Sequence, residues 1–329
     1  MVRIPVLAIH GGAGTINRAA LSPEAERGYR DALRAILEKG REALADGASA
    51  LDAVTLAVSM LEDCPLFNAG RGAVYTSAET HELDAAIMDG ETLRTGALSC
   101  VHGVKNPIRA ARVVMEQSPH VLMTGDGAMA FLRARGVEFM PDAYFDTEQR
   151  LEQLRLAQAV RPDAMVLDHD GAAAGKMGFA GNPLDEKTKM GTVGAVAMDA
   201  QGRLAAATST GGMTNKLPGR VGDTPIVGAG CYADDGVAVS CTGSGEYFIR
   251  LVVGHDVAAR MRYQGAALDD AVRAVLERVG ALGGTGGLIA VDREGNVSLP
   301  FISEGMYRGC VRGNETARVA IYGAEDEDC

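Results

Sequence analysis

The chain has 329 residues, of which 47% are hydrophobic and 23% are charged, and its formal charge at pH 7 is −11. This composition predicts a soluble globular protein that can bury a sizeable core. The acidic excess argues against a nucleic-acid partner, because phosphate binding depends mainly on clustered Lys and Arg. We therefore expect a small molecule or a peptide as the ligand.

Neither a membrane span nor a secretion signal is evident. Gly and charged residues interrupt every apolar run before it reaches the roughly 18 residues that a membrane helix needs. The amino-terminal MVRIPVLAIHGG is interrupted by Pro5 and carries no small-residue cleavage site, which predicts a buried strand and not a signal peptide. The six cysteines include no C-x-x-C pair, so reduced thiols are expected. Together these features predict a cytoplasmic protein.

The first elements are a strand and two helices. Residues 4–10 are nearly all apolar, which predicts a strand covered on both faces, and the HGGAG that follows predicts a tight turn. Helical spacing then runs from residue 24 to 46, and Gly47 ends it. A second, buried helix is predicted from about Ser49, where Asp52 three residues later suggests a capping box.

The rest of the chain mixes helices with strands. Further helices are predicted at 107–117, 127–135, 147–160, 248–263 and 268–279, and strands at 85–88, 121–124 and 237–240. The segments that begin at Gly194 and at Gly286 both read as strand, Asp-x-x-Gly turn, strand, and each predicts a hairpin. This mixture is typical of an α/β or an α+β protein.

One long segment departs from this regularity. Residues 161–189 are rich in Gly, Ala, Asp and Lys and lack helical or strand periodicity over most of their length. A stretch of this length without structure is normally a functional loop or a linker, so we expect it to be mobile and exposed. GTVGAVAMD follows almost directly and returns to a buried strand. The order is therefore linker, Gly191, Thr192, strand.

This order suits a protein that cuts itself before Thr192. The Thr192 hydroxyl could attack the Gly191 carbonyl, and hydrolysis of the resulting ester would release an α-amino group. Such an amine has an ordinary pKa of about 8, so a good fraction of it is unprotonated near neutral pH. It can then act as the base for the hydroxyl of the same residue, and no His is required. The branched Cβ also restricts χ1 and orients the oxygen. A Thr that merely opens a strand would look the same locally, so the hypothesis depends on the other motifs.

Those motifs occur in order along nearly the whole chain: AIHGGAG, CPLFNAGRGAVYT, HELDAAIMDG, KMGTVGAVAMD, ATSTGGMTNKLPGRVGD, GAGCYADD, SCTGSGE, GGLIAVD and EGMYRG. With them the chain resembles the plant-type, or type III, asparaginases with isoaspartyl aminopeptidase activity, within the N-terminal-nucleophile hydrolases. The resemblance implies an α+β fold, a four-layer αββα sandwich. It also implies an α subunit of residues 1–191, which includes the flexible linker at 161–191, and a β subunit of residues 192–329. Together these form one domain, and two αβ pairs form a dimer.

The resemblance assigns the catalytic residues. Thr192 is the nucleophile, and Thr210 holds its hydroxyl and assists self-cleavage between Gly191 and Thr192. Thr242 and Gly243 form the oxyanion hole through a hydroxyl and a backbone N–H, donors that meet charge developing only in the transition state. SCTGSG lacks the first Gly of a serine-hydrolase elbow, and HGGAG lacks the Lys of a phosphate loop, which argues against both of those sites.

It also assigns the substrate-binding residues. Arg220 would bind the α-carboxylate of the substrate and Asp223 its α-ammonium, which matches the chemistry of a planar guanidinium fork and of a carboxylate. A weak surface ion pair between these two residues is the alternative. Gly245 would line the site, and Asn68 and the backbone of Gly11 would lie toward the nucleophile.

A structural sodium ion is implied as well, held by backbone carbonyls of the loop after the second helix, and no catalytic cofactor is implied. The matching residues are Leu61, Glu62, Cys64, Phe67, Ala69 and Arg71. Because every residue has a carbonyl, the side chains do not reveal these ligands.

The implied activity is hydrolysis of L-asparagine to aspartate and ammonia and removal of isoaspartyl residues from dipeptides. A glycosylasparaginase shares fold and nucleophile, but the absence of a signal peptide and of a disulfide framework argues against it. A threonine endopeptidase is a further alternative. So is a binding protein of the same fold that is neither cut nor catalytic.

Overall fold

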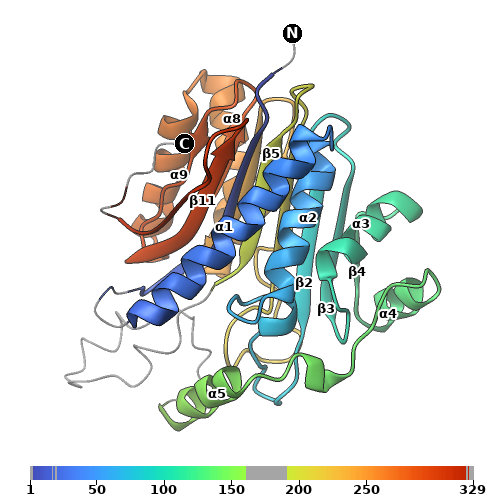
Figure 1. Cartoon of the computed structure of the whole chain (residues 1–329). Coiled ribbons are helices and arrows are strands. Elements are labelled where there is room, and N and C mark those ends of the chain that lie inside the picture. Colours follow the sequence, from blue (N-terminus) through green and yellow to red (C-terminus); the bar gives the residue numbers. More distant parts are fainter. Residues whose placement is uncertain (1–2, 17, 19–20, 161–190, 324, 326–329) are drawn as a thin grey trace.

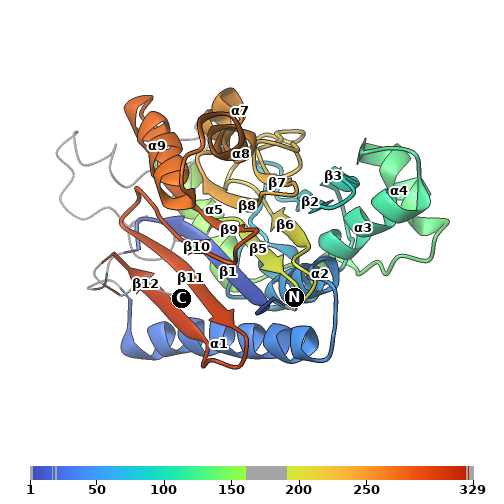
Figure 2. The same ribbon diagram turned by 90° about the horizontal axis from the view of Figure 1, so that it is seen from above.

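The computed structural model describes residues 3–16, 18, 21–160, 191–323 and 325, and shows four layers in the order helix, sheet, sheet, helix (Figures 1 and 2). This confirms the α+β sandwich.

The strands are β1 (Val6–Gly14), β2 (Leu83–Asp89), β3 (Thr95–Val101), β4 (Leu122–Thr124), β5 (Val193–Met198), β6 (Leu204–Thr210), β7 (Cys231–Ala233), β8 (Val237–Gly243), β9 (Gly286–Asp292), β10 (Val297–Ser298), β11 (Gly305–Arg312) and β12 (Arg318–Tyr322). The helices are α1 (Pro23–Ala45), α2 (Ala50–Asp63), α3 (Pro107–Gln117), α4 (Gly125–Arg133), α5 (Glu148–Val160), α7 (Gly245–Leu251), α8 (Val253–Gln264) and α9 (Leu268–Ala281), with short 3-10 turns at Gly70–Gly72 and Asp142–Tyr144.

The larger sheet has the strand order β12-β11-β1-β5-β6-β2-β3-β4, and the smaller one has the order β10-β9-β8-β7. Seen from above, α1 and α2 cover the outer face of the larger sheet, and α7, α8 and α9 cover the outer face of the smaller one (Figure 2). The predicted hairpins are confirmed, because β5 pairs with β6 and β9 with β10, both antiparallel.

Burial on both faces explains the almost continuous apolar sequence of β1. Successive side chains of a strand point to opposite faces. Leu7 and Ile9 join the core beneath α1 and α2, whereas Val6 and Ala8 join the core between the two sheets. A third core lies between the smaller sheet and its helices. Alternate residues of one strand therefore hold two layers together.

The tight turn predicted at HGGAG is wrong. Strand β1 continues to Gly14 and pairs with β11, and the pairing register shifts between His10 and Gly12. Such a bulge absorbs an extra residue without ending the strand. Glycine is required here: a Cβ on Gly11 would lie 2.4 Å from Phe67 Cε1, and Gly12 has a φ of +112°.

The predicted helix starts are largely confirmed. One predicted helix, however, forms two separate helices in the structure. Ser49 caps α2, since its Oγ accepts the Asp52 N–H at 3.1 Å. The helix predicted at 248–263 is divided into α7 and α8 by Val252, which is left-handed with a φ of 50°. Here the amides of Gly254 and His255 donate to carbonyls of the 228–229 turn, which interrupts the helical hydrogen bonds.

The linker predicted at 161–191 lies outside the described residues except for Gly191, which is buried. Within the described parts of the chain no helix is long and apolar enough to cross a membrane. Cys64, Cys100, Cys231 and Cys241 are free thiols. Cys310 is disulfide-bonded, so the expectation of reduced thiols is wrong at that position.

Candidate active site

Thr192 lies directly before β5 and faces the end of β6. Because Val193 pairs with Ser209, the strand register places Thr192 beside Thr210. The Thr192 hydroxyl donates to Thr210 Oγ1 at 3.1 Å, and both residues are buried. Thr210 Oγ1 also accepts the Gly212 N–H at 2.9 Å. The Thr192 oxygen is therefore held in one position by a partner that is itself fixed.

The bulged part of β1 covers the peptide bond before Thr192. A Cβ on Gly12 would lie 2.5 Å from Gly191 N, 2.8 Å from its O and 2.9 Å from its C. A side chain at position 12 would clash with Gly191 at these distances. Because Gly12 has none, its backbone packs directly on Gly191. The Gly191 carbonyl therefore lies against strand β1 of the larger sheet.

The smaller sheet supplies Thr242 and Gly243 at the end of β8. Thr242 is fully buried, and its hydroxyl accepts the Ala13 N–H at 3.3 Å. A hydroxyl that accepts one hydrogen bond can still donate another. Gly243 has a φ of +145°, and a Cβ there would lie 2.3 Å from the Thr285 carbonyl oxygen, so a side chain cannot be accommodated. The two sheets meet at this point.

A cavity of about 20 Å³ lies in front of Thr192. This volume is sufficient for about one water molecule. It is lined by Gly191, Thr192, Thr210, Gly212, Met213, Arg220, Gly222, Asp223, Thr224 and Gly243. Six residues singled out from the sequence thus share one cavity, whereas Thr242, Gly245, Asn68 and Gly11 lie around it.

Arg220 is held by a partner that the sequence analysis missed. Its Nε and Nη2 donate to the two carboxylate oxygens of Glu246 at 2.9 and 3.0 Å. This bidentate contact uses one edge of the guanidinium and leaves Nη1 and the second Nη2 hydrogen for another acceptor. The alternative of a surface ion pair between Arg220 and Asp223 is not what the structure shows. Glu246 directly follows SCTGSG, so only its proximity in sequence pointed to it.

Asp223 is a buried carboxyl group beside the Arg220 guanidinium. Burial raises its pKa to about 7, and the positive charge of Arg220 opposes that shift. Its Oδ2 has no hydrogen-bond partner among the described residues. A Cβ on Gly245 would lie 2.8 Å from Asp223 Oδ1 and 3.2 Å from Arg220 Nη2, so glycine is needed there. A buried oxygen without a partner suits a cationic ligand.

Asn68 and Gly11 have structural contacts. Asn68 Nδ2 donates to the Gly212 carbonyl at 2.8 Å, and its Oδ1 accepts the Val74 N–H at 3.0 Å. The Gly211 N–H in turn donates to the Asn68 carbonyl at 3.1 Å. Asn68 therefore holds the Gly211–Gly212 turn beside Thr210, and Gly11 packs on an aromatic ring, as described above.

A hydrogen-bonded chain of buried side chains lies behind the nucleophile. His10 Nε2 contacts Ser240 Oγ at 2.9 Å, and Ser240 Oγ contacts Thr208 Oγ1 at 2.7 Å. Burial lowers the pKa of His10 to about 3, while its interaction with the Thr192 backbone acts in the opposite direction. His10 is thus neutral at physiological pH, and the chain links β1, β6 and β8 across the two sheets.

The loop after α2, where the resemblance implies a sodium ion, packs closely on its own backbone carbonyls. A Cβ on Gly70 would lie 2.5 Å from the Glu62 carbonyl oxygen, and one on Gly72 would lie 2.1 Å from that of Phe67. The loop is therefore tightly coiled around its own carbonyls. Within the described residues no three His, Cys, Asp or Glu side chains form a metal-binding group, so a cation here would depend on backbone oxygens.

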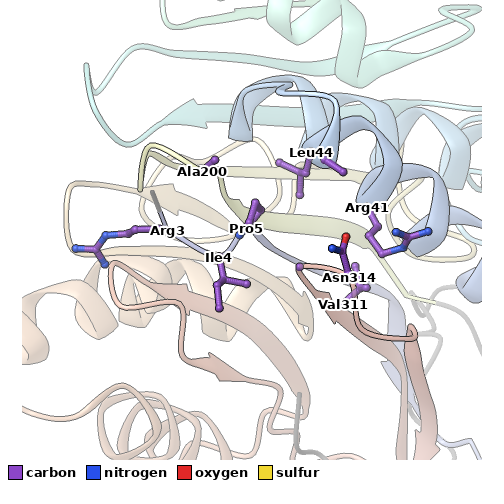
Figure 3. Close-up of a pocket in the computed structure, with 10 residues that line it drawn as sticks. Arg3, Ile4, Pro5, Arg41, Leu44, Ala200, Val311 and Asn314 are labelled. Atoms are coloured by element: carbon purple, nitrogen blue, oxygen red, sulfur yellow. The ribbon is translucent and has the colours of Figure 1, made fainter. Parts of the chain in front are cut away.

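A wider cavity of about 550 Å³ lies at the opposite end of β1 (Figure 3). Arg3 and Pro5 line it from the chain before β1, Arg41 and Leu44 from α1, and Asn314 from the turn after β11. It contains none of the residues around Thr192, so its size does not make it the reactive site.

Comparisons with known proteins agree with this geometry. The family described as asparaginase matches residues 3–321. The isoaspartyl peptidase of Escherichia coli (strain K12) is 58% identical over 319 residues, which cover 96% of each chain. The probable isoaspartyl peptidase/L-asparaginase 2 of Arabidopsis thaliana is 41% identical over 327 residues (96% of this chain and 98% of the relative), and the plant-type L-asparaginase of Pyrococcus abyssi is 41% identical over 310 (91% and 96%). The chain therefore belongs to the asparaginase family.

Proposed function

We propose that the chain hydrolyses L-asparagine to aspartate and ammonia and removes isoaspartyl residues from dipeptides, after cutting itself between Gly191 and Thr192. The observation that carries this proposal is the buried Thr192 hydroxyl, 3.1 Å from Thr210 Oγ1, in one cavity with Arg220 and Asp223. Membership of the asparaginase family and the names of the relatives support the same reaction class.

Self-cleavage begins when Thr192 Oγ attacks the Gly191 carbonyl carbon. The acyl group moves from the Thr192 nitrogen to its oxygen, and water then hydrolyses the ester to a Gly191 carboxylate and a free Thr192 amine. The close packing of Gly12 on Gly191 supports this step, because it prevents the scissile carbonyl from moving away. The products are an α subunit of residues 1–191 and a β subunit of residues 192–329, which stay together as one domain.

The free amine of Thr192 then acts as base in the hydrolysis of substrate. It takes the hydroxyl proton while Oγ attacks the β-carbonyl carbon, and the oxyanion that forms accepts hydrogen bonds from the Thr242 hydroxyl and the Gly243 N–H. The protonated amine returns the proton to the leaving nitrogen, which departs as ammonia or as an amino acid. Water cleaves the remaining β-aspartyl ester, releases aspartate and regenerates Thr192.

Arg220 and Asp223 would orient the aspartyl part of the substrate. The free N–H groups of Arg220 donate to the α-carboxylate, and the Asp223 carboxylate, whose Oδ2 has no partner among the described residues, accepts hydrogen bonds from the α-ammonium. L-Asparagine and β-aspartyl dipeptides present the same α-carboxylate and α-ammonium. They differ only in the leaving group, which is ammonia or an amino acid. Gly245 permits the close approach of the two side chains, and Asn68 and Gly11 support the walls of the site.

The uncut chain should not bind substrate. Gly191 lines the cavity, and about 20 Å³ has room for a water molecule but not for asparagine. Departure of Gly191 after cleavage opens the space in front of Thr192. Cleavage would thus both create the catalytic amine and admit the substrate.

Three further features belong to the proposal. A sodium ion would be held by the carbonyls of Leu61, Glu62, Cys64, Phe67, Ala69 and Arg71, where it would stabilise the loop and take no part in the reaction. Two αβ pairs would form a dimer. The enzyme would act in the cytoplasm.

The test combines intact-mass analysis with two activity assays. Purified protein should contain two chains, the second beginning at Thr192, and should release ammonia from L-asparagine and an amino acid from β-aspartyl dipeptides. Thr192→Ala should remain whole and inactive, because it lacks the attacking oxygen. A wild-type protein that stays whole yet is fully active would refute the mechanism. Activity confined to sugar-linked asparagine would favour the glycosylasparaginase alternative.

A further inference from the structure

Residues 211–230, between β6 and β7, carry Arg220 and Asp223 and contain no helix or strand of their own. All of these residues are described. A loop of this length needs anchors for its backbone elsewhere in the fold. One anchor is a backbone hydrogen bond from the Ser77 N–H to the Lys216 carbonyl at 2.8 Å. A second anchor, next to Arg220, is made by side chains.

Lys216 and Glu82 form a reciprocal clamp. The buried ammonium of Lys216 donates to the Glu82 backbone carbonyl at 2.9 Å. The Glu82 carboxylate in return accepts the Gly219 N–H, at 2.8 Å to Oε2 and 3.1 Å to Oε1. Each side chain thus binds the backbone of the opposite segment. Gly219 immediately precedes Arg220 and has a φ of +85°, so the clamp fixes the turn from which the guanidinium extends.

The ammonium of Lys216 lies among buried carboxyl groups in the protein interior. Lys216, Glu82 and Asp84 are all buried, and Asp84 Oδ1 accepts the Cys100 N–H at 2.9 Å. Burial lowers the pKa of Lys216, whereas Asp84 and Glu82 oppose that shift. A buried ammonium is tolerated only where such partners offset its desolvation. Glu82, just before β2, and Asp84, near its start, thus stabilise the buried ammonium of Lys216.

The ammonium also reaches the turn beside the nucleophile. A Cβ on Gly212 would lie 2.8 Å from Lys216 Nζ, and the Gly212 N–H donates to Thr210 Oγ1. Neither Lys216 nor Glu82 lines the cavity in front of Thr192. Both therefore act on the site through the backbone that they hold, without contact with a ligand.

We propose that Glu82 and Lys216 are positioning residues that set the location of Arg220 and thereby the affinity for the α-carboxylate of the substrate. This inference rests on the proposed function. Because Glu82 precedes the cleavage site and Lys216 follows it, the clamp joins the two subunits after cleavage. Substrate recognition by the β subunit then depends on a carboxylate that the α subunit supplies.

The experiment compares two substrates. One is a β-aspartyl dipeptide, and the other is the same compound with the α-carboxylate of its aspartyl residue replaced by a carboxamide. Glu82→Ala should raise KM for the first about tenfold while kcat stays within about threefold, because Arg220 is displaced but the nucleophile is not. On the carboxamide, which leaves Arg220 without a carboxylate to bind, Glu82→Ala should change kcat/KM by less than about twofold.

Matched variants separate positioning from general damage. Glu82→Gln retains an oxygen for the Gly219 N–H and should restore most of the affinity. Glu91→Ala removes an exposed carboxylate from the same subunit and should match the wild type on both substrates. If Glu82→Ala does not fold or is not cut, Glu82→Asp serves instead, since it keeps the charge beside Lys216 but is too short to reach Gly219.

Equal losses of kcat/KM on the two substrates, or an unchanged KM for the dipeptide, would refute the proposal that Glu82 and Lys216 position Arg220. Wild-type activity on the dipeptide and a chain beginning at Thr192 are measured first. An inactive wild type would refute the proposed function itself, whereas an active wild type with equal losses in the variant refutes only the positioning role.

Discussion

The buried carboxyl of Asp223 makes substrate capture depend on pH. Burial raises its pKa to about 7 in the uncut chain, above its ordinary range. We expect the free cut enzyme to keep this pKa, so protonation removes the negative charge as pH falls through about 7. Only the carboxylate can bind the α-ammonium of the substrate. From pH 8 to pH 6 the ionised fraction falls from about ten in eleven to about one in eleven, which is about a tenfold loss of competent enzyme.

This loss should occur in kcat/KM and not in kcat. The profile of kcat/KM reports groups of the free enzyme, whereas kcat reports groups of the complex. Once the substrate ammonium is bound, its charge lowers the pKa of Asp223 and keeps it ionised. The Thr192 amine must be neutral in both states, so it affects both profiles. Between pH 8 and 6, kcat/KM should therefore fall about ten times further than kcat.

Steady-state kinetics with a β-aspartyl dipeptide across this pH range measures the difference. Asp223→Asn cannot titrate, so its two profiles should run parallel at reduced activity, and this variant is the control. Wild-type profiles of kcat and kcat/KM with the same acid limb would refute the reasoning. They would show that Asp223 is ionised throughout or does not contact the ammonium.

Three other substitutions test the same site by steady-state kinetics. Thr242→Val keeps the side-chain shape without the hydroxyl, so kcat should fall about a hundredfold or more while Thr242→Ser retains most of it; a rise confined to KM would contradict the oxyanion role. Arg220→Lys cannot reproduce the parallel, bidentate hydrogen bonds of the guanidinium, so kcat/KM should fall more than about tenfold, and a value within about twofold of wild type would place the carboxylate elsewhere. Gly245→Ala puts a methyl 2.8 Å from Asp223 Oδ1, so KM should rise while self-cleavage, followed by intact mass, continues; an unchanged KM would contradict this packing.

Much of the fold followed from local sequence patterns. The apolar run of residues 4–10 predicted a strand buried on both faces, and Ser49 predicted the start of α2, because both signals lie within a few neighbouring residues. The order of linker, Gly191 and Thr192 indicated where the chain would cut itself, which remains to be tested. The motifs around it led to the asparaginase family, which the comparisons confirm.

The two wrong predictions of secondary structure occurred where contacts with distant segments determine the backbone conformation. Glycines in HGGAG indicated a turn, but pairing with β11 keeps β1 extended through Gly14. Apolar spacing at 248–263 indicated one helix, but carbonyls of the 228–229 turn bind the amides at its break. Residue type alone does not distinguish a glycine that permits a turn from one that permits close packing, as Gly12 does on Gly191.

The sequence alone determined which chemical groups the site contains, since a hydroxyl before a strand, a guanidinium and a carboxylate are properties of Thr192, Arg220 and Asp223 themselves. Only the tertiary structure decided how those groups are held. The contacts of Arg220 with Glu246 and of Glu82 with Gly219 join residues 26 and 137 positions apart. Such distances depend on the packing of two sheets and the loops between them, and no local periodicity encodes that packing.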